Sequence, residues 1–111
     1  LDLYASTGDF TALHAVTSTH AFRVLTPFMA DRELALRYHW QALAAAYVGI
    51  GTPKIDASKH DTPHAWEEIL PRAVASEDEH TIKLVDSCRA EGQARGGGAY
   101  RVVAAWRTGL V

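Results

Sequence analysis

Cysteine is almost absent from this chain: Cys88 is the single one among 111 residues, so no disulfide can form within it. Nothing therefore indicates an oxidising compartment, and we expect a cytoplasmic protein. No apolar stretch approaches the roughly 18 residues that a membrane-spanning helix needs. No signal peptide or lipidation motif opens the chain either, so we expect no membrane association.

An excess of positive charge is also missing. The 11 lysine and arginine residues face 13 aspartate and glutamate residues, which leaves a net charge of −2. Because nucleic-acid binding needs a basic face to meet the phosphates, we expect no nucleic-acid partner. The charged fraction of 22% and the hydrophobic fraction of 48% are those of an ordinary folded domain, which excludes a disordered chain.

Alanine is abundant, and valine and isoleucine rarely alternate with polar residues, which favours helices over strands. Capping residues and helix breakers divide the chain into segments. The expected helices cover residues 10–26, 32–50, 63–74, 76–93 and 99–108, with N-caps at Thr7 or Asp9, at Asp31, at Asp61 or Thr62, and at Ser76 in a capping box with Glu79. The sequence therefore predicts an all-α bundle of about five helices, with residues 1–111 as a single domain or as part of one.

The segment 32–50 has no polar face beyond its first turns. A helix that is apolar nearly all round is a central one, so we predict that it is the most buried element, with helices 10–26 and 76–93 packed on it. A chain of this size buries only about two thirds of its unfolded surface, which is too little to cover these apolar faces. The sequence thus predicts a fragment of a larger all-helical protein, associated with the missing N-terminal portion or with a second copy.

Two histidines stand in the first long helix among apolar neighbours. His14, Thr17, His20 and Arg23 follow one another at i+3 steps and form a slanted polar row. The imidazoles could be hydrogen-bonded to neighbouring carbonyls at the helix edges. They could equally supply metal ligands or proton-transfer groups, because neutral imidazole suits iron, zinc and copper.

A second constellation opens the helix 76–93, where His80 and Lys83 share a face one turn apart. On spacing alone, a solvated first turn explains it. His39, inside the apolar helix, is more simply a satisfied core or pocket-wall residue, and Cys88 a small core residue without neighbours that would activate it. The sequence contains no zinc-finger spacing, no His-Glu-x-x-His motif and no phosphate-binding loop.

Taken together and in order, three segments resemble the C-terminal part of questin oxidase-like proteins. They are residues 14–25 (HAVTSTHAFRVL), 34–47 (LALRYHWQALAAAY) and 78–83 (DEHTIK). The resemblance implies an all-α fold and an oxidoreductase of secondary metabolism. The family's activity is similar to Baeyer–Villiger-type or dioxygenase-like oxidative cleavage of rings in phenolic or quinone polyketides, so a small aromatic molecule would be the substrate.

The resemblance also implies a metal centre. Some members of the family are thought to hold non-haem iron with histidines and a modified lysine. On the matching positions, His14, His20 and His80 are the candidate metal ligands and Lys83 the candidate modified lysine. Neutral imidazoles suit ferrous iron, and a carboxylated lysine would add an anionic oxygen donor. NADPH is a candidate reductant, although no motif that would bind it is visible.

Full members of the family run to several hundred residues, so this chain would be a fragment that is inactive alone. The alternative is a non-enzymatic helical module that binds a small molecule or another protein and carries its histidines only as packing residues. Stoichiometric iron that depends on His20 or His80 would distinguish the enzyme from the module.

Overall fold

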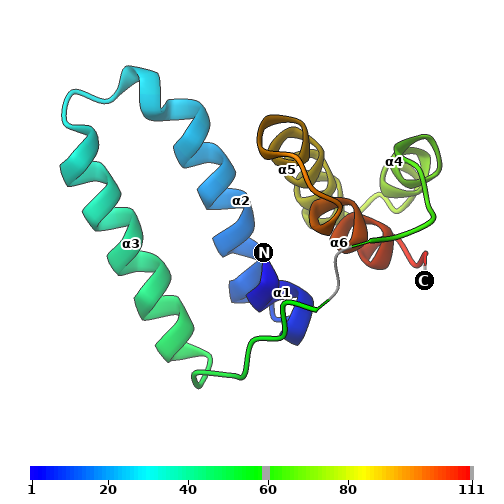
Figure 1. Cartoon of the computed structure of the whole chain (residues 1–111), viewed down its shortest axis with the longest axis horizontal. Helices are drawn as coiled ribbons and strands as arrows, with labels where there is room; N and C mark the ends of the chain where they lie inside the picture. The colour runs from blue at the N-terminus through cyan, green and yellow to red at the C-terminus, as the bar shows by residue number, and fades with distance from the viewer. Residues whose placement is uncertain (59–60, 111) are drawn as a thin grey trace.

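The fold is all-α, as the sequence predicts. The computed structural model describes residues 1–58 and 61–110, and these contain α-helices and one 3-10 turn without a strand (Figure 1). The elements are α1 (Asp2–Thr7), α2 (Phe10–Leu25), η1 (Thr26–Phe28), α3 (Arg32–Gly49), α4 (Trp66–Ala75), α5 (Glu79–Arg95) and α6 (Ala99–Arg107). The five expected helices are present, and α1 is an addition.

The helix starts show which capping predictions are correct. Asp9 caps α2 by accepting from the backbone N–H groups of Thr11 and Ala12, and Asp31 caps α3 by accepting from that of Leu34. The capping box at Ser76 is wrong. Ser76 ends α4, where its hydroxyl donates to the carbonyl of Ala73.

Two other boundaries differ for reasons that lie in tertiary contacts. The helix expected over residues 63–74 is α4, and it begins at Trp66 rather than at residue 63. Asp61 and the carbonyl of Thr62 accept hydrogen bonds from the guanidinium of Arg101 instead of capping this helix. The short α1 has no periodic pattern of its own. It is fixed by Tyr4, which is fully buried and packs edge-on against Trp106 at 5.6 Å between ring centroids.

The helices form two groups that meet along α2. A hairpin of α2 and α3 stands on one side, and α4, α5 and α6 gather on the other (Figure 1). α5 packs on α2, α4 and α6, so it is the central helix. The largest fully buried side chains of the core are Tyr4, Leu13, Ile69, Leu84, Val85 and Cys88.

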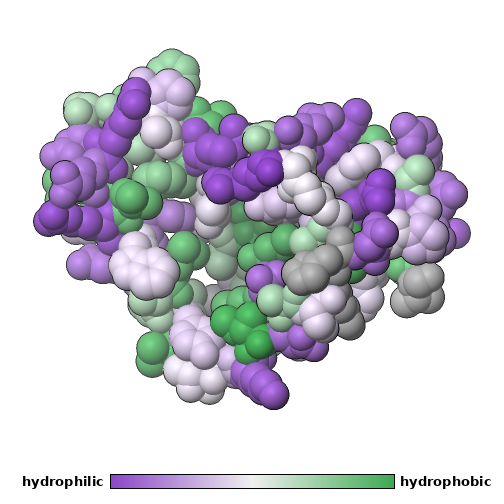
Figure 2. Space-filling view, viewed as in Figure 1, coloured by the Kyte–Doolittle hydropathy of each residue, from purple (hydrophilic) through white to green (hydrophobic). Residues whose placement is uncertain are grey.

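The prediction that residues 32–50 form the most buried element is wrong. None of the residues of α3 is buried, and Tyr38, Trp40 and Val48 are each more than 60% exposed. The helix packs on α2, and its other faces have no comparable contact with the part of the chain described. Hydrophobic residues consequently lie at the surface on both sides of the notch between the hairpin and the remaining helices (Figure 2).

None of the described helices combines the length and the apolar composition that crossing a membrane requires. The expected association with an N-terminal portion or a second copy remains a prediction, and the exposed apolar faces of α3 are the surface on which it depends.

Leu84 provides a test of the core around α5. We expect Leu84→Ala to lower the free energy of unfolding by about 2–5 kcal/mol, because the lost side chain leaves a cavity among residues that cannot close it. Val74→Ala is the matched control, since Val74 is 67% exposed, and it should change the free energy by less than about 0.5 kcal/mol. Urea unfolding followed by circular dichroism measures both, and equal effects would contradict the central place of α5.

Candidate functional site

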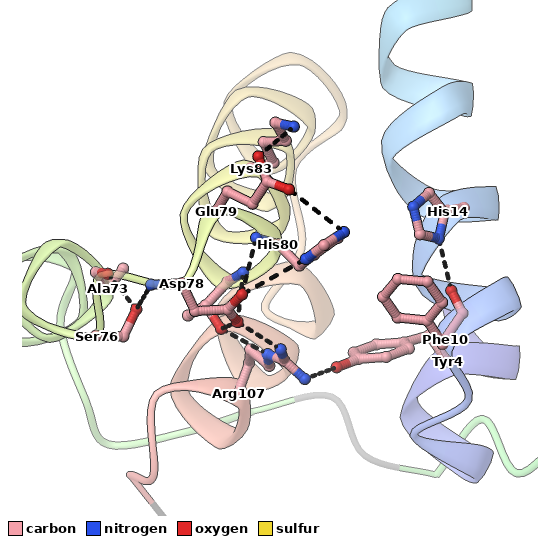
Figure 3. A network of polar contacts seen from close by, with 11 residues as sticks. Tyr4, Phe10, His14, Ala73, Ser76, Asp78, Glu79, His80, Lys83 and Arg107 are labelled. Carbon is pink, nitrogen blue, oxygen red and sulfur yellow. Dashed lines mark hydrogen bonds and ion pairs between the residues drawn. The ribbon is translucent and has the colours of Figure 1, made fainter.

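Three rings from two helices meet where α2 begins beside the start of α5. The ring centroids of Phe10 and His14, both on α2, are 4.5 Å apart. The ring of His80, in the first turn of α5, lies 4.8 Å from Phe10 and 5.6 Å from His14. All three contacts are edge-to-face, and Figure 3 shows the side chains from α2 projecting toward His80. We call Phe10, His14 and His80 the ring cluster.

The hydrogen bond of His14 fixes which of its nitrogens is available. Nδ1 lies 2.8 Å from the carbonyl oxygen of Phe10. A carbonyl oxygen only accepts, so Nδ1 carries the proton and donates. In the neutral ring, Nε2 then holds the lone pair, which is the state that a metal ligand or a hydrogen-bond acceptor requires.

His80 is held in place by the cap of its own helix. Oδ1 of Asp78 accepts from the backbone N–H of His80 at 3.2 Å, and Oδ2 accepts from the backbone N–H and the hydroxyl of Thr81. Arg107 of α6 reaches the same turn: Nη2 donates to Asp78 at 2.8 Å and Nε donates to Thr81 at 2.8 Å. Its Nη1 lies 3.3 Å from the hydroxyl of the buried Tyr4, so one guanidinium connects α6, α5 and α1 (Figure 3).

These contacts keep Asp78 ionised. The hydrogen bonds from the Thr81 hydroxyl and from Arg107 hold the pKa of the Asp78 carboxyl well below its usual range. The turn that carries His80 is therefore anchored by a carboxylate at neutral pH. Asp78 also lies 3.5 Å from Nδ1 of His80, so its charge faces the imidazole as well as the helix start.

A second polar cluster lies between α2 and α5 around Glu91, which is 3% exposed. Oε1 of Glu91 accepts from Nδ1 of His20 at 2.8 Å and from Nε of Arg23 at 2.6 Å, and Oε2 accepts from Nε of Arg95 at 2.8 Å. Burial alone would raise the pKa of the Glu91 carboxyl, but the hydrogen bonds from Arg95, His20 and Arg23 outweigh it and lower the pKa to about 2. We call these four residues the Glu91 cluster.

The structure thus divides the four predicted ligands. His14 and His80 meet in the ring cluster, whereas His20 belongs to the Glu91 cluster, about 9 Å further along α2 by helical rise. Lys83 is 65% exposed, and its Nζ lies 3.4 Å from the carboxylate of Glu79. Among the described residues, no three histidine, cysteine or carboxylate side chains lie close enough together to hold one ion. The ligand role of each residue remains a prediction.

Two other predictions concern residues outside these clusters. His39 stacks on Phe22 at 4.6 Å between ring centroids, and its Nε2 lies 3.1 Å from the hydroxyl of Thr19, so it is a satisfied packing residue between α2 and α3. Cys88 is fully buried, and burial raises the pKa of its thiol to about 12. The thiol therefore remains protonated, as expected for a core residue rather than a nucleophile.

Sequence reasoning missed Glu91 and Arg107. Glu91 had a signal: on α5 it continues the buried positions Thr81, Leu84 and Cys88 at helical spacing, so a carboxylate stands where the pattern asks for a core residue. A charge at such a position needs a partner from another helix. Arg107 had no comparable signal, because its three partners come from segments that only the fold brings together.

The anchoring role of Asp78 can be compared with that of an ordinary cap. Asp31→Ala removes only a helix cap and should cost about 1 kcal/mol of stability. Asp78→Ala removes a cap together with the bonds to the Thr81 hydroxyl and Arg107, so we expect the larger fall in the melting temperature. Thermal unfolding followed by circular dichroism measures both variants. Equal falls would mean that Arg107 adds nothing to the cap.

The lowered pKa of the Glu91 carboxyl predicts that the free energy of unfolding depends on pH. The pKa of its carboxyl is about 2 in the folded chain against an ordinary value of 4.5, so the unfolded state takes up the proton first as the pH falls. The stabilisation is present above the ordinary pKa and is lost progressively as the pH falls from there toward 2. Urea unfolding between about pH 6 and about pH 3 should show a shallower decline for Glu91→Gln than for the natural chain.

Comparison with known proteins agrees with the resemblance in the sequence. The questin oxidase-like family matches residues 4–88, which are most of the chain and include all four predicted ligands. Glu91 and Arg107 lie beyond the matched range. No curated protein and no solved structure matches the chain. The chain therefore belongs to the questin oxidase-like family, which indicates an oxidoreductase.

Proposed function

We propose that this protein is an oxidoreductase that cleaves a ring of a phenolic or quinone substrate of the polyketide type, in a Baeyer–Villiger-type or dioxygenase-like reaction. Membership of the questin oxidase-like family supports an oxidoreductase. The observation that supports a substrate site at this position is the ring cluster. It brings an exposed phenyl group and two imidazoles from separate helices to one point.

The ring cluster has the surface that an aromatic substrate needs. Phe10 is 60% exposed, although its ring edge contacts both imidazoles, so one side of the cluster is open. Aromatic rings prefer edge-to-face or offset stacking, and a planar substrate can add to such a group in either way. The lone pair of His14 Nε2 can meanwhile accept a hydrogen bond from a hydroxyl on that substrate.

Non-haem iron, which the family resemblance implies, belongs to this proposal in a limited form. His14 and His80 could supply two imidazole ligands, a donor type that suits ferrous iron. The described residues do not complete the site, since no third donor joins the pair, and Lys83 would have to leave Glu79 to take part. The fit of these residues to an iron ion is therefore partial.

Oxygen consumption tests the proposed function. The intact protein, supplied with ferrous iron and a phenolic quinone, should consume oxygen and release a ring-opened product detectable by mass spectrometry. His14→Ala and His80→Ala should each lower the rate by about 100-fold or more, which is the scale expected for loss of a group that acts at the reacting centre.

His64→Ala is the control for these variants, because His64 also pairs with a carboxylate, that of Glu68, and is not one of the three residues of the ring cluster. Its rate should equal that of the natural protein. Binding of the quinone without oxygen consumption would contradict the proposal and favour the non-enzymatic binding module. If His80→Ala kept the full rate of oxygen consumption, the reaction would not depend on the ring cluster.

A further inference from the structure

The helix α6 contains no residue of the ring cluster, yet it contacts the segment in which the cluster begins. Trp106 packs edge-on against the buried ring of Tyr4, with 5.6 Å between the ring centroids. It also lies against Gly8, because a Cβ atom at that position would stand 3.2 Å from the indole ring. Gly8 ends α1 and precedes the start of α2 by two residues, so α6 holds the junction from which Phe10 starts.

The next residue, Arg107, reaches the other side of the ring cluster. Its Nη2 and Nε donate to the Asp78 carboxyl and the Thr81 hydroxyl, both at 2.8 Å, in the turn that carries His80. Its Nη1 donates to the Tyr4 hydroxyl at 3.3 Å. A guanidinium is planar and presents its donors in a fixed fork, so its bonds to α5 and to α1 constrain each other. Figure 3 shows this group between Tyr4 and the turn of His80.

We propose that Arg107 is a positioning residue that holds His80 against the two rings of α2, and thereby makes α6 part of the substrate site. The cap from Asp78 ties the first turn of α5 to its own helix, and the guanidinium ties the same turn to α1. The inference rests on the proposed function for what the ring cluster binds. It adds to the site a helix that lies beyond the residues matched by the questin oxidase-like family.

The contacts of the ring cluster differ in how far they depend on this bridge. Phe10 and His14 stand four residues apart on α2, so the spacing of the helix alone brings their rings together. The contacts of His80 with these two rings, at 4.8 and 5.6 Å, join separate helices. His80 also lies ahead of Leu84, the first fully buried aliphatic side chain of α5. We therefore expect loss of Arg107 to weaken the two contacts of His80 and to spare the contact within α2.

Cross-peaks between ring protons in nuclear Overhauser spectra of the intact protein measure these contacts without any substrate. Arg107→Met keeps the length of the side chain and removes its donors, so the cross-peaks from His80 to the rings of α2 should be lost. The cross-peak between Phe10 and His14 should remain, which makes it an internal control. A variant that merely loosened the fold would not separate the two kinds of contact in this way.

Arg101→Met is the matched control, because Arg101 also extends from α6 to another segment, where a carboxylate and a carbonyl outside the ring cluster accept its bonds. It should keep all three cross-peaks. Tyr4→Phe removes only the hydroxyl and preserves the ring that packs on Trp106. It should weaken the cross-peaks of His80, and it keeps the test decisive if Arg107→Met does not fold.

Binding of a planar hydroxynaphthoquinone, followed by absorbance, tests whether α6 belongs to the substrate site. The natural protein and Arg101→Met should bind the quinone equally. Arg107→Met should bind it about three- to tenfold more weakly, which is the scale of one aromatic contact.

Unchanged cross-peaks of His80 in a folded Arg107→Met would overturn the positioning role, as would an equal loss in Arg101→Met. Where Arg107→Met does not fold, unchanged cross-peaks in Tyr4→Phe would do the same. Lost cross-peaks with unchanged quinone affinity would overturn the assignment of α6 to the substrate site. A natural protein that binds no quinone would contradict the proposed function, whereas the cross-peaks, which need no substrate, would still decide the role of Arg107.

Discussion

α2 and α5 pack along a line that is apolar in the middle and polar toward both ends. Leu13 on α2 and Leu84 and Cys88 on α5 are fully buried or nearly so. On one side of this apolar contact His14 meets His80, and on the other His20 meets Glu91. Because the buried contact sets how the two helices cross, it also sets the separation and orientation of both polar clusters.

Much of the fold could be predicted because helix limits depend on local chemistry. Asp9 and Asp31 cap the helices that they were expected to cap, and the five expected helices are present. The burial of α3 could not be predicted. Its pattern shows that Tyr38 and Trp40 stand on an apolar helix, but a pattern does not show whether another helix covers that face. Burial depends on the partner, which is a tertiary property.

The candidate site, like the fold, could be predicted from the sequence only in part. The spacing of His14 and His20 on one helix is visible in the sequence, as is that of His80 and Lys83 on another. Which of them meet is not visible, because 71 residues separate His20 from Glu91 and the pairing depends on the crossing of the helices. Local spacing therefore identified the histidines, and the fold alone assigned their neighbours.

The bond between Arg107 and Tyr4 joins residues 103 positions apart. Contacts of such long range form late in folding, because the entropy of closing the loop has to be overcome first. The same guanidinium secures the turn that carries His80. During synthesis, that turn therefore lacks its final anchor until α6 has left the ribosome. The cap that Asp78 makes with the start of α5 is local and can form with the helix itself, so the bonds from Arg107 are an anchor that is added to a turn already formed.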